Sequence, residues 1–149
     1  QLVIQGREHI VGSRSSDARA RLTRSSQLAS AVTVAGTAKR DAGNLAITAE
    51  LEVKQAQGDL EVLVVVFESG LTTRVSRGEN TGRKLSNDFV VRRLTHAGAL
   101  AGKPGTRAKV SRRIDLDPNW KLANLGVGIF VQAPDTMAIH GATRVPITH

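Results

Sequence analysis

The chain has 149 residues and no cysteine, and its 21 Lys and Arg against 13 Asp and Glu give a formal net charge of +8. The missing thiols exclude disulfides, thiolate metal sites and thiol nucleophiles within this sequence. Aromatic residues make up only 3%, with no Tyr. The stacking surfaces of single-strand and RNA readers therefore cannot form, and nucleic acid is not an expected partner. The positive charge leaves an acidic partner, or peripheral contact with an anionic surface, open.

The longest apolar run is LEVLVVVF at Leu60–Phe67. A transmembrane helix needs about 18 or more apolar residues, so no membrane-spanning helix is predicted. Residue 1 is Gln and no secretion signal follows it. We therefore expect a processed product, a fragment or a partial chain.

The chain opens with residues that predict a hairpin followed by a helix. Short apolar runs flank Gly6-Arg7, which is typical of two strands joined by a turn. Ser13 to Ser16 supply candidate N-caps, Asp17 suits the first helical turn, and a thin apolar stripe continues to about Ala29. We expect a basic helix here.

From residue 32 the apolar residues alternate with polar ones, a pattern typical of half-buried antiparallel strands. Residues 60–67 are apolar at nearly every position, which predicts the centre of a sheet. The pattern predicts strands at 32–38, 45–53, 60–67, 71–76, 108–116, 126–132 and 137–145.

A second helix is predicted between residues 86 and 98. Val90, Leu94 and Ala97 follow helical spacing, Ser86, Asn87 or Asp88 could cap it, and Gly98 could end it. The predicted fold class is mainly β, an antiparallel β-sandwich with one inserted helix.

Two segments carry a family resemblance, RGENTGRKLSNDFVVRRL at Arg77–Leu94 and LGVGIFVQAPDTMAIHGATRVPI at Leu125–Ile147. They resemble the C-terminal part of a bacterial secreted thioredoxin-like family of unknown function, the domain of unknown function 1223 type. That family is similar to outer-membrane-protein-28-like lipoproteins. QLVIQGREHIVGSRSSDARARLTRSS looks like the closing hairpin and last helix of a thioredoxin fold.

The resemblance implies two domains, a C-terminal remnant of a thioredoxin-like domain at 1–29 and a β-sandwich domain at 30–149. It also implies periplasmic or secreted localisation and a Cys pair upstream of this chain. The family often has His just before the second predicted helix, where this chain has Asn87. Because Asn cannot replace His as a metal ligand or an acid–base group, we expect neither role at that position.

The glycine-containing segment at residues 77–84 is the candidate anion- or partner-binding site. Freed backbone amides and guanidinium groups suit phosphate and carboxylate. The simpler interpretation is a structured turn in which Glu79 pairs with Arg77 or Arg83. The candidate residues are Arg77, Gly78, Glu79, Asn80, Arg83 and Lys84.

Other patterns fall short of a catalytic or metal site. The four His residues, His9, His96, His140 and His149, lack the spacing of helix-borne metal ligands, and no GxSxG motif occurs. Asp115, Asp117 and Asn119 alternate as in calcium loops, but the glycine and the closing acid of such loops are missing. We predict no catalytic residue, no metal and no cofactor.

We therefore expect a non-catalytic C-terminal portion of a secreted thioredoxin-like protein, acting as an interaction or structural module. Whether the protein is an enzyme stays open, because the chain could be the substrate-side domain of a thiol–disulfide oxidoreductase, with Gly78 to Gly82 near the upstream thiols. A third hypothesis is a basic accessory subunit of a larger, membrane-associated assembly. The open edge at Leu2–Ile4 predicts a cover, either a protein partner or the missing upstream segment.

Overall fold

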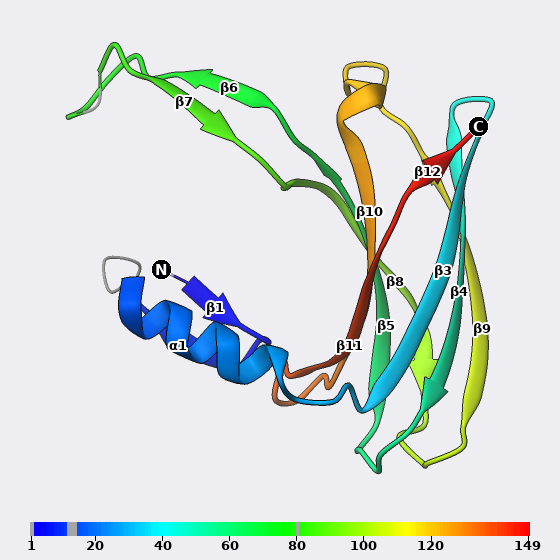
Figure 1. The fold of residues 1–149 in the computed structure, drawn as a ribbon. Coiled ribbons are helices and arrows are strands. Elements are labelled where there is room, and N and C mark those ends of the chain that lie inside the picture. Colours follow the sequence, from blue (N-terminus) through cyan, green and yellow to red (C-terminus); the bar gives the residue numbers. More distant parts are fainter. Residues whose placement is uncertain (1, 12–14, 80) are drawn as a thin grey trace.

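Two four-stranded sheets pack face to face and enclose the hydrophobic core (Figure 1). The computed structural model describes residues 2–11, 15–79 and 81–149. The first sheet, here called the β5 sheet, has the order β11 (Ile139–Val145), β10 (Leu125–Gln132), β5 (Leu60–Glu68) and β8 (Val90–Leu100). The second, the β4 sheet, has the order β12 (Ile147–Thr148), β3 (Val32–Asp41), β4 (Asn44–Val53) and β9 (Arg107–Asp115). Neighbouring strands are antiparallel except β12 beside β3. The predicted mainly β, antiparallel sandwich is confirmed.

The core forms where the alternating residues of the two sheets meet. In β4 the buried residues are Leu45, Ile47, Ala49, Leu51 and Val53, as the period of two predicts. In β5, Leu60, Val62, Val64 and Val66 point into the same core. Trp120 packs against this core from the turn that precedes the 3-10 helix η1 (Leu122–Asn124).

The predicted helix between residues 86 and 98 is wrong, because residues 86–87 belong to the strand β7 (Lys84–Asn87) and residues 90–98 belong to β8. The strand pairs antiparallel with β5, with Val65 opposite Leu94 and Leu60 opposite Leu100. Two register shifts interrupt the alternation, so the apolar residues fall at spacings of four and three, which mimic a helix. Leu94 is 55% exposed and Ala97 is buried in the core. Pairing with the central strand outweighs the local helical pattern.

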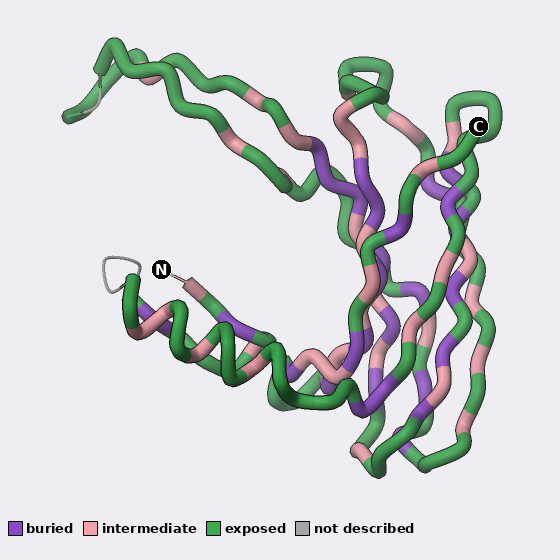
Figure 2. The backbone as a smooth tube through the Cα atoms, viewed as in Figure 1, coloured by how far each residue is buried: buried purple, intermediate pink, exposed green. Residues whose placement is uncertain are grey.

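Two segments project from the sandwich on the side of the β5 sheet (Figure 1). One, the N-terminal arm, comprises β1 (Leu2–Ile4), β2 (Glu8–Ile10) and α1 (Ser15–Ser26). The other, the β6–β7 ribbon, comprises β6 (Leu71–Arg74) and β7 (Lys84–Asn87). Figure 2 shows that both are mostly exposed, whereas the buried residues concentrate in the sandwich.

The N-terminal hairpin and helix are confirmed as local elements. β1 pairs only with β2, so its other edge is open among the described residues. The helix ends at Ser26 rather than at Ala29, and none of its residues is buried. Of the candidate caps, Ser13 lies outside the described residues. The boundary between 1–29 and 30–149 stays a prediction, although the hairpin and helix do form a unit that projects from the sandwich.

Within the described ranges, no helix combines the length and the apolar character needed to cross a membrane.

Candidate functional site: the outer face of the β5 sheet

The two outer faces of the sandwich differ in chemistry. On the β4 sheet the charged outer side chains of β4 pair with those of β9, Glu50 with Lys109 and Glu52 with Arg107. On the β5 sheet, Leu63, Val65, Phe67 and Phe130 lie outside the core cluster, on the face that the projecting segments overhang. Because β5 is apolar on both sides, this outer face is not a typical solvent surface of a sandwich.

Two glycines in β10 shape this outer face. Gly126 lies opposite Phe67 and Gly128 lies opposite Val65. A Cβ at residue 126 would lie 2.3 Å from Phe67 Cζ, and one at residue 128 would lie 2.8 Å from Val65 Cγ1. The missing side chains therefore let the Phe67 ring lie across the neighbouring strand.

Phe67, Phe89 and Arg144 form an aromatic–arginine cluster where the β6–β7 ribbon leaves the sheet. The two ring centroids are 5.2 Å apart and tilted by 48°. The Arg144 guanidinium carbon lies 5.4 Å from the Phe67 centroid and 5.6 Å from the Phe89 centroid. Arg144 makes no ion pair among the described residues. The cluster thus offers one exposed Phe and one guanidinium that no described carboxylate neutralises, and both residue types are enriched in protein interfaces.

The backbone at Phe89 is held in a conformation that bulky residues rarely adopt. Its φ is +54°, in the left-handed region. The Phe89 N–H donates to Ser69 Oγ at 3.2 Å, and the Gly70 N–H donates to Asp88 Oδ1 at 2.7 Å. These bonds fix the turn, yet the residue remains 59% exposed. Backbone strain of this kind clusters at functional sites.

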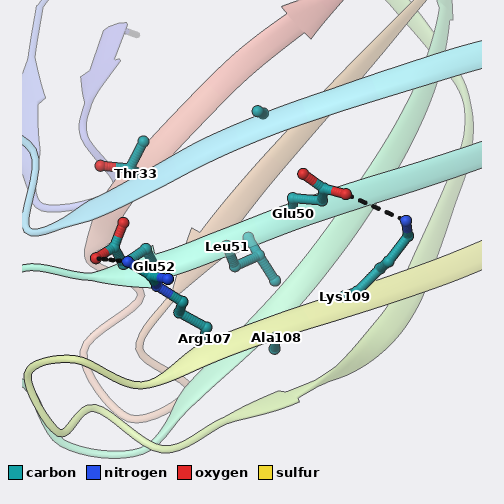
Figure 3. A pocket seen from close by; sticks show the side chains of 8 residues that line it. Thr33, Glu50, Leu51, Glu52, Arg107, Ala108 and Lys109 are labelled. Carbon is teal, nitrogen blue, oxygen red and sulfur yellow. Dashed lines mark hydrogen bonds and ion pairs between the residues drawn. The ribbon is translucent and has the colours of Figure 1, made fainter.

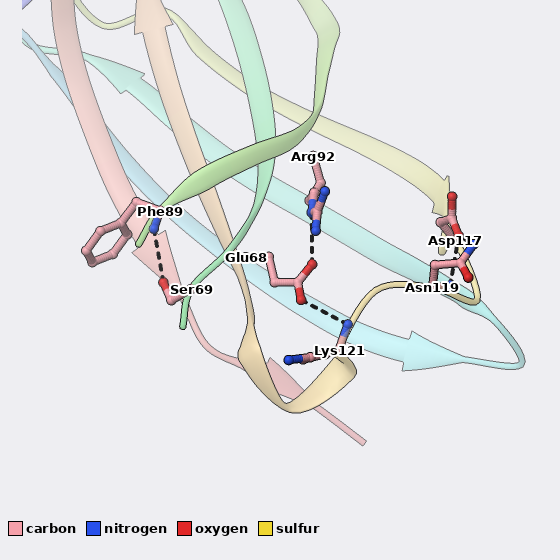
Figure 4. A network of polar contacts seen from close by, with 7 residues as sticks. All are labelled: Glu68, Ser69, Phe89, Arg92, Asp117, Asn119 and Lys121. Atoms are coloured by element: carbon pink, nitrogen blue, oxygen red, sulfur yellow. Dashed lines mark hydrogen bonds and ion pairs between the residues drawn. The ribbon is translucent and has the colours of Figure 1, made fainter. Parts of the chain in front are cut away.

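A buried ion pair anchors the same junction (Figure 4). The Glu68 carboxylate accepts from Arg92 Nε at 2.8 Å and from the Lys121 backbone N–H at 3.1 Å. The β8 register passes from Arg93 to Val91, so Arg92 is the extra residue of a bulge, and its side chain can turn toward Glu68. The pair ties β5, β8 and the segment before β10 together.

The predicted anion-binding residues occupy the β6–β7 turn, at the far end of the ribbon. Arg77, Gly78, Glu79, Arg83 and Lys84 are exposed, and Asn80 lies outside the described residues. Gly78 and Gly82 have φ of +89° and +84°, as turn glycines do. Among the described residues, Glu79 forms no ion pair with Arg77 or Arg83. Backbone bonds between Val75 and residues 82 and 83 hold the turn instead. Whether the loop binds an anion or a partner stays a prediction.

A hollow of about 480 Å³ on the β4 sheet is a weaker candidate (Figure 3). Its charged side chains pair with one another, Glu50 with Lys109 at 3.1 Å and Glu52 with Arg107 at 3.2 Å. Hydrogen bonds from Lys54 and then Arg107 hold the pKa of the Glu52 carboxyl below its usual value. The hollow therefore presents little unpaired charge to a ligand.

The IDLDPNW segment ends β9 and continues into a turn. Asp117 Oδ1 accepts from the Asn119 backbone N–H at 2.8 Å and from Asn119 Nδ2 at 2.9 Å (Figure 4). These two bonds are the main cause of the lowered pKa of Asp117. The described residues hold no group of three or more His, Asp or Glu side chains placed to bind a metal.

Sequence reasoning missed the aromatic–arginine cluster and the buried Glu68. Phe67, Phe89 and Arg144 are far apart in the chain, and only strand pairing brings them together. One signal was available: an acid follows the apolar run of β5 directly, and buried acids are usually paired.

Comparison with known proteins identifies the family. A family model described as "Protein of unknown function (DUF1223)" matches residues 1–132. The chain therefore belongs to this family. No curated protein matches it.

Solved structures share the fold at low sequence identity. HBP35 of Porphyromonas gingivalis aligns with a TM-score of 0.63 and 12% identity, over 86% of this chain and 45% of that one. A domain of the outer membrane lipoprotein Omp28 from the same organism aligns with a TM-score of 0.51 and 13% identity, over 81% of this chain and 91% of that one. Protein AGR_C_4864 from Agrobacterium tumefaciens aligns with a TM-score of 0.54 and 19% identity, over 94% of this chain and 58% of that one. The chain thus spans about half the length of the first and third of these proteins.

Proposed function

We propose that this member of the DUF1223 family is a non-catalytic interaction module of a secreted, thioredoxin-like protein. Its binding surface is the outer face of the β5 sheet, and the occupant of that face is the thioredoxin-like domain of the same protein. The single observation that carries the proposal is the two-sided apolar character of β5, whose outer residues Leu63 and Val65 remain partly exposed in the described part of the chain.

The position of the N-terminal arm favours this occupant. The arm projects on the side of the β5 sheet, and β1 has an open edge there. Residues 1–26 resemble the closing hairpin and last helix of a thioredoxin fold. A domain that continues the β1–β2 sheet beyond β1 would lie beside the outer face of the β5 sheet, next to the aromatic–arginine cluster.

The chemistry of this chain supports a non-catalytic role for it. Disulfide exchange needs a thiolate, and the sequence contains no Cys. Any redox centre would therefore belong to the upstream domain, and the β5 sheet would position that domain. A periplasmic or secreted location follows from the family resemblance, and likeness to an outer membrane lipoprotein domain is consistent with it.

The first test is the intact mass of the natural protein together with N-terminal sequencing. We expect a mass well above 15.9 kDa and a Cys pair upstream of residue 1. A natural mass of 15.9 kDa would refute the proposal, because no domain would then be present to occupy the face.

The second test locates the contact by hydrogen exchange. We expect residues 2–10 and the β6–β7 ribbon to exchange slowly in the natural protein and quickly in the 149-residue chain. Leu94→Asp would place a charge on the occupied face and restore fast exchange of the β6–β7 ribbon in the natural protein. Leu122→Asp is the matched control, because Leu122 is similarly exposed at 44% but lies in η1 and not in a strand of the β5 sheet. Equal effects of the two substitutions would count against the surface.

Two alternatives predict different behaviour. If the chain is the substrate-side domain of an oxidoreductase, loss of the glycines at 78 and 82 should slow disulfide reduction by the natural protein. If it is a basic accessory subunit, its association should weaken steeply with salt, whereas an apolar interface should not. The β5 outer face favours the interaction module over both.

A further inference from the structure

A cavity of about 580 Å³ lies between the N-terminal arm and the end of the sandwich. Its walls come from the β1–β2 turn, the last turn of α1 and the segment 28–31 that follows it, the segment between β4 and β5, and the start of β11. This volume falls within the range of small-molecule sites. The cavity is separate from the aromatic–arginine cluster and from the predicted loop at 77–84, since it shares no residue with either.

Two arginines and one histidine line the cavity, Arg7, Arg24 and His140. Among the described residues, neither guanidinium forms an ion pair. The one acid in the wall, Glu8, already binds Arg21 at 2.8 Å. The pKa of His140 lies below its usual value, first because of burial and second because of the nearby Arg7 charge. Arg7 and Arg24 therefore bring two unpaired positive charges to the wall, and Glu8, which shares Arg21 with Asp17, offsets them only in part.

The remaining wall residues can accommodate both a polar group and an organic body. Gln55, Gln57 and Ser25 offer neutral hydrogen-bonding groups, whereas Ile4, Leu28 and Ile139 are apolar. The carbonyls at the end of α1 disfavour an anion, but the Arg24 and Ser25 carbonyls already accept from Gln27 and Leu28. These two hydrogen bonds reduce the negative potential that the helix end presents to the cavity.

We propose that this cavity binds a small organic phosphate. The phosphate group lies between Arg7 and Arg24, with His140 beside it, and the organic part rests on Ile4, Leu28 and Ile139. A dianionic phosphate matches two guanidiniums, whereas a single carboxylate would leave one of them unneutralised. The site goes beyond the proposed interaction module and does not depend on it.

The test is calorimetric titration of the 149-residue chain with phenyl phosphate, with benzoate as the carboxylate comparison. We expect saturable binding of phenyl phosphate that Arg7→Gln and Arg24→Gln each weaken about tenfold, the change that about 1.4 kcal/mol of binding free energy produces. Arg19→Gln is the matched control. It removes the same charge as Arg24→Gln from the same helix, but Arg19 does not line the cavity. Binding should also raise the pKa of His140, which NMR of its ring protons would follow.

Three results would overturn the proposal: no saturable binding of phenyl phosphate or of phosphatidic acid vesicles, equal binding of benzoate, or equal weakening by Arg19→Gln. Vesicles of phosphatidylcholine with phosphatidic acid distinguish the sources of the phosphate. A lipid headgroup would be supported if the chain binds the vesicles, if phenyl phosphate competes with this binding, and if Arg7→Gln abolishes it. Binding of phenyl phosphate without vesicle binding would support a soluble ester.

Discussion

The buried ion pair between Glu68 and Arg92 gives the sharpest stability prediction. Arg92→Met removes the charge but keeps much of the side-chain length, and it leaves Glu68, whose side chain is 1% exposed, with only the Lys121 N–H. Removing one partner of a buried pair costs about 3–5 kcal/mol. Because the Arg92 side chain is 31% exposed, water can partly replace its hydrogen bond to Glu68. We therefore expect the free energy of unfolding to fall by about 3 kcal/mol. For a chain of this size, that loss lowers Tm by roughly 6–12 °C.

Urea unfolding followed by circular dichroism measures this loss. Arg93→Met is the control, since Arg93 is the exposed neighbour and makes no ion pair among the described residues; its cost should stay within about 0.5 kcal/mol. Glu68→Gln combined with Arg92→Met should recover part of the loss, because a neutral amide no longer buries a charge. If Arg92→Met costs no more than Arg93→Met, or if the double variant is less stable than Arg92→Met alone, the reasoning is refuted.

Two further predictions concern packing and pH. Gly126→Ala should lower the free energy of unfolding by about 1–3 kcal/mol, because the new Cβ displaces the Phe67 ring. Gly58→Ala should lower it far less, since no atom lies within 4 Å of its new Cβ. Equal Tm values for the two variants would contradict the packing argument. The folded pKa of His140 lies below its usual 6.5, so the unfolded state binds the proton more readily, and stability should fall as pH drops from about 6.5 toward the folded value. His140→Gln should remove this pH dependence of stability in urea titrations. Arg7→Gln should raise the His140 pKa in NMR titrations. If His140→Gln leaves the pH profile of stability unchanged, His140 is not its source.

The aromatic–arginine cluster and the Glu68 pair meet at one junction, the root of the β6–β7 ribbon. The pair fixes the backbone of β5 and β8, and the strained turn at Phe89 directs its ring onto Phe67. Stability and surface chemistry are thus coupled at this junction. A variant that loosens the pair should therefore also weaken any contact made through the outer face of the β5 sheet.

Local patterns in the sequence were enough to predict most strands of this protein. The period of two in β4 and the continuous apolar run of β5 reflect burial on one and on two faces, and burial is a property that each strand carries in its own residues. The hairpin, the first helix and the turn at Asp117 follow from turn and capping residues within a few positions of one another. The net charge of +8 and the missing thiols are likewise properties of the sequence alone.

Only the tertiary structure decided the conformation of β8 and the composition of the sites. Residues 90–100 carry a helical spacing, and they become a strand because the edge of β5 offers them a ladder of hydrogen bonds that no local pattern encodes. Phe67, Phe89 and Arg144 meet through strand order, as do Arg7, Arg24 and His140 through the position of the N-terminal arm. Such clusters depend on contacts between residues far apart in the chain, which the spacing of neighbouring residues cannot specify.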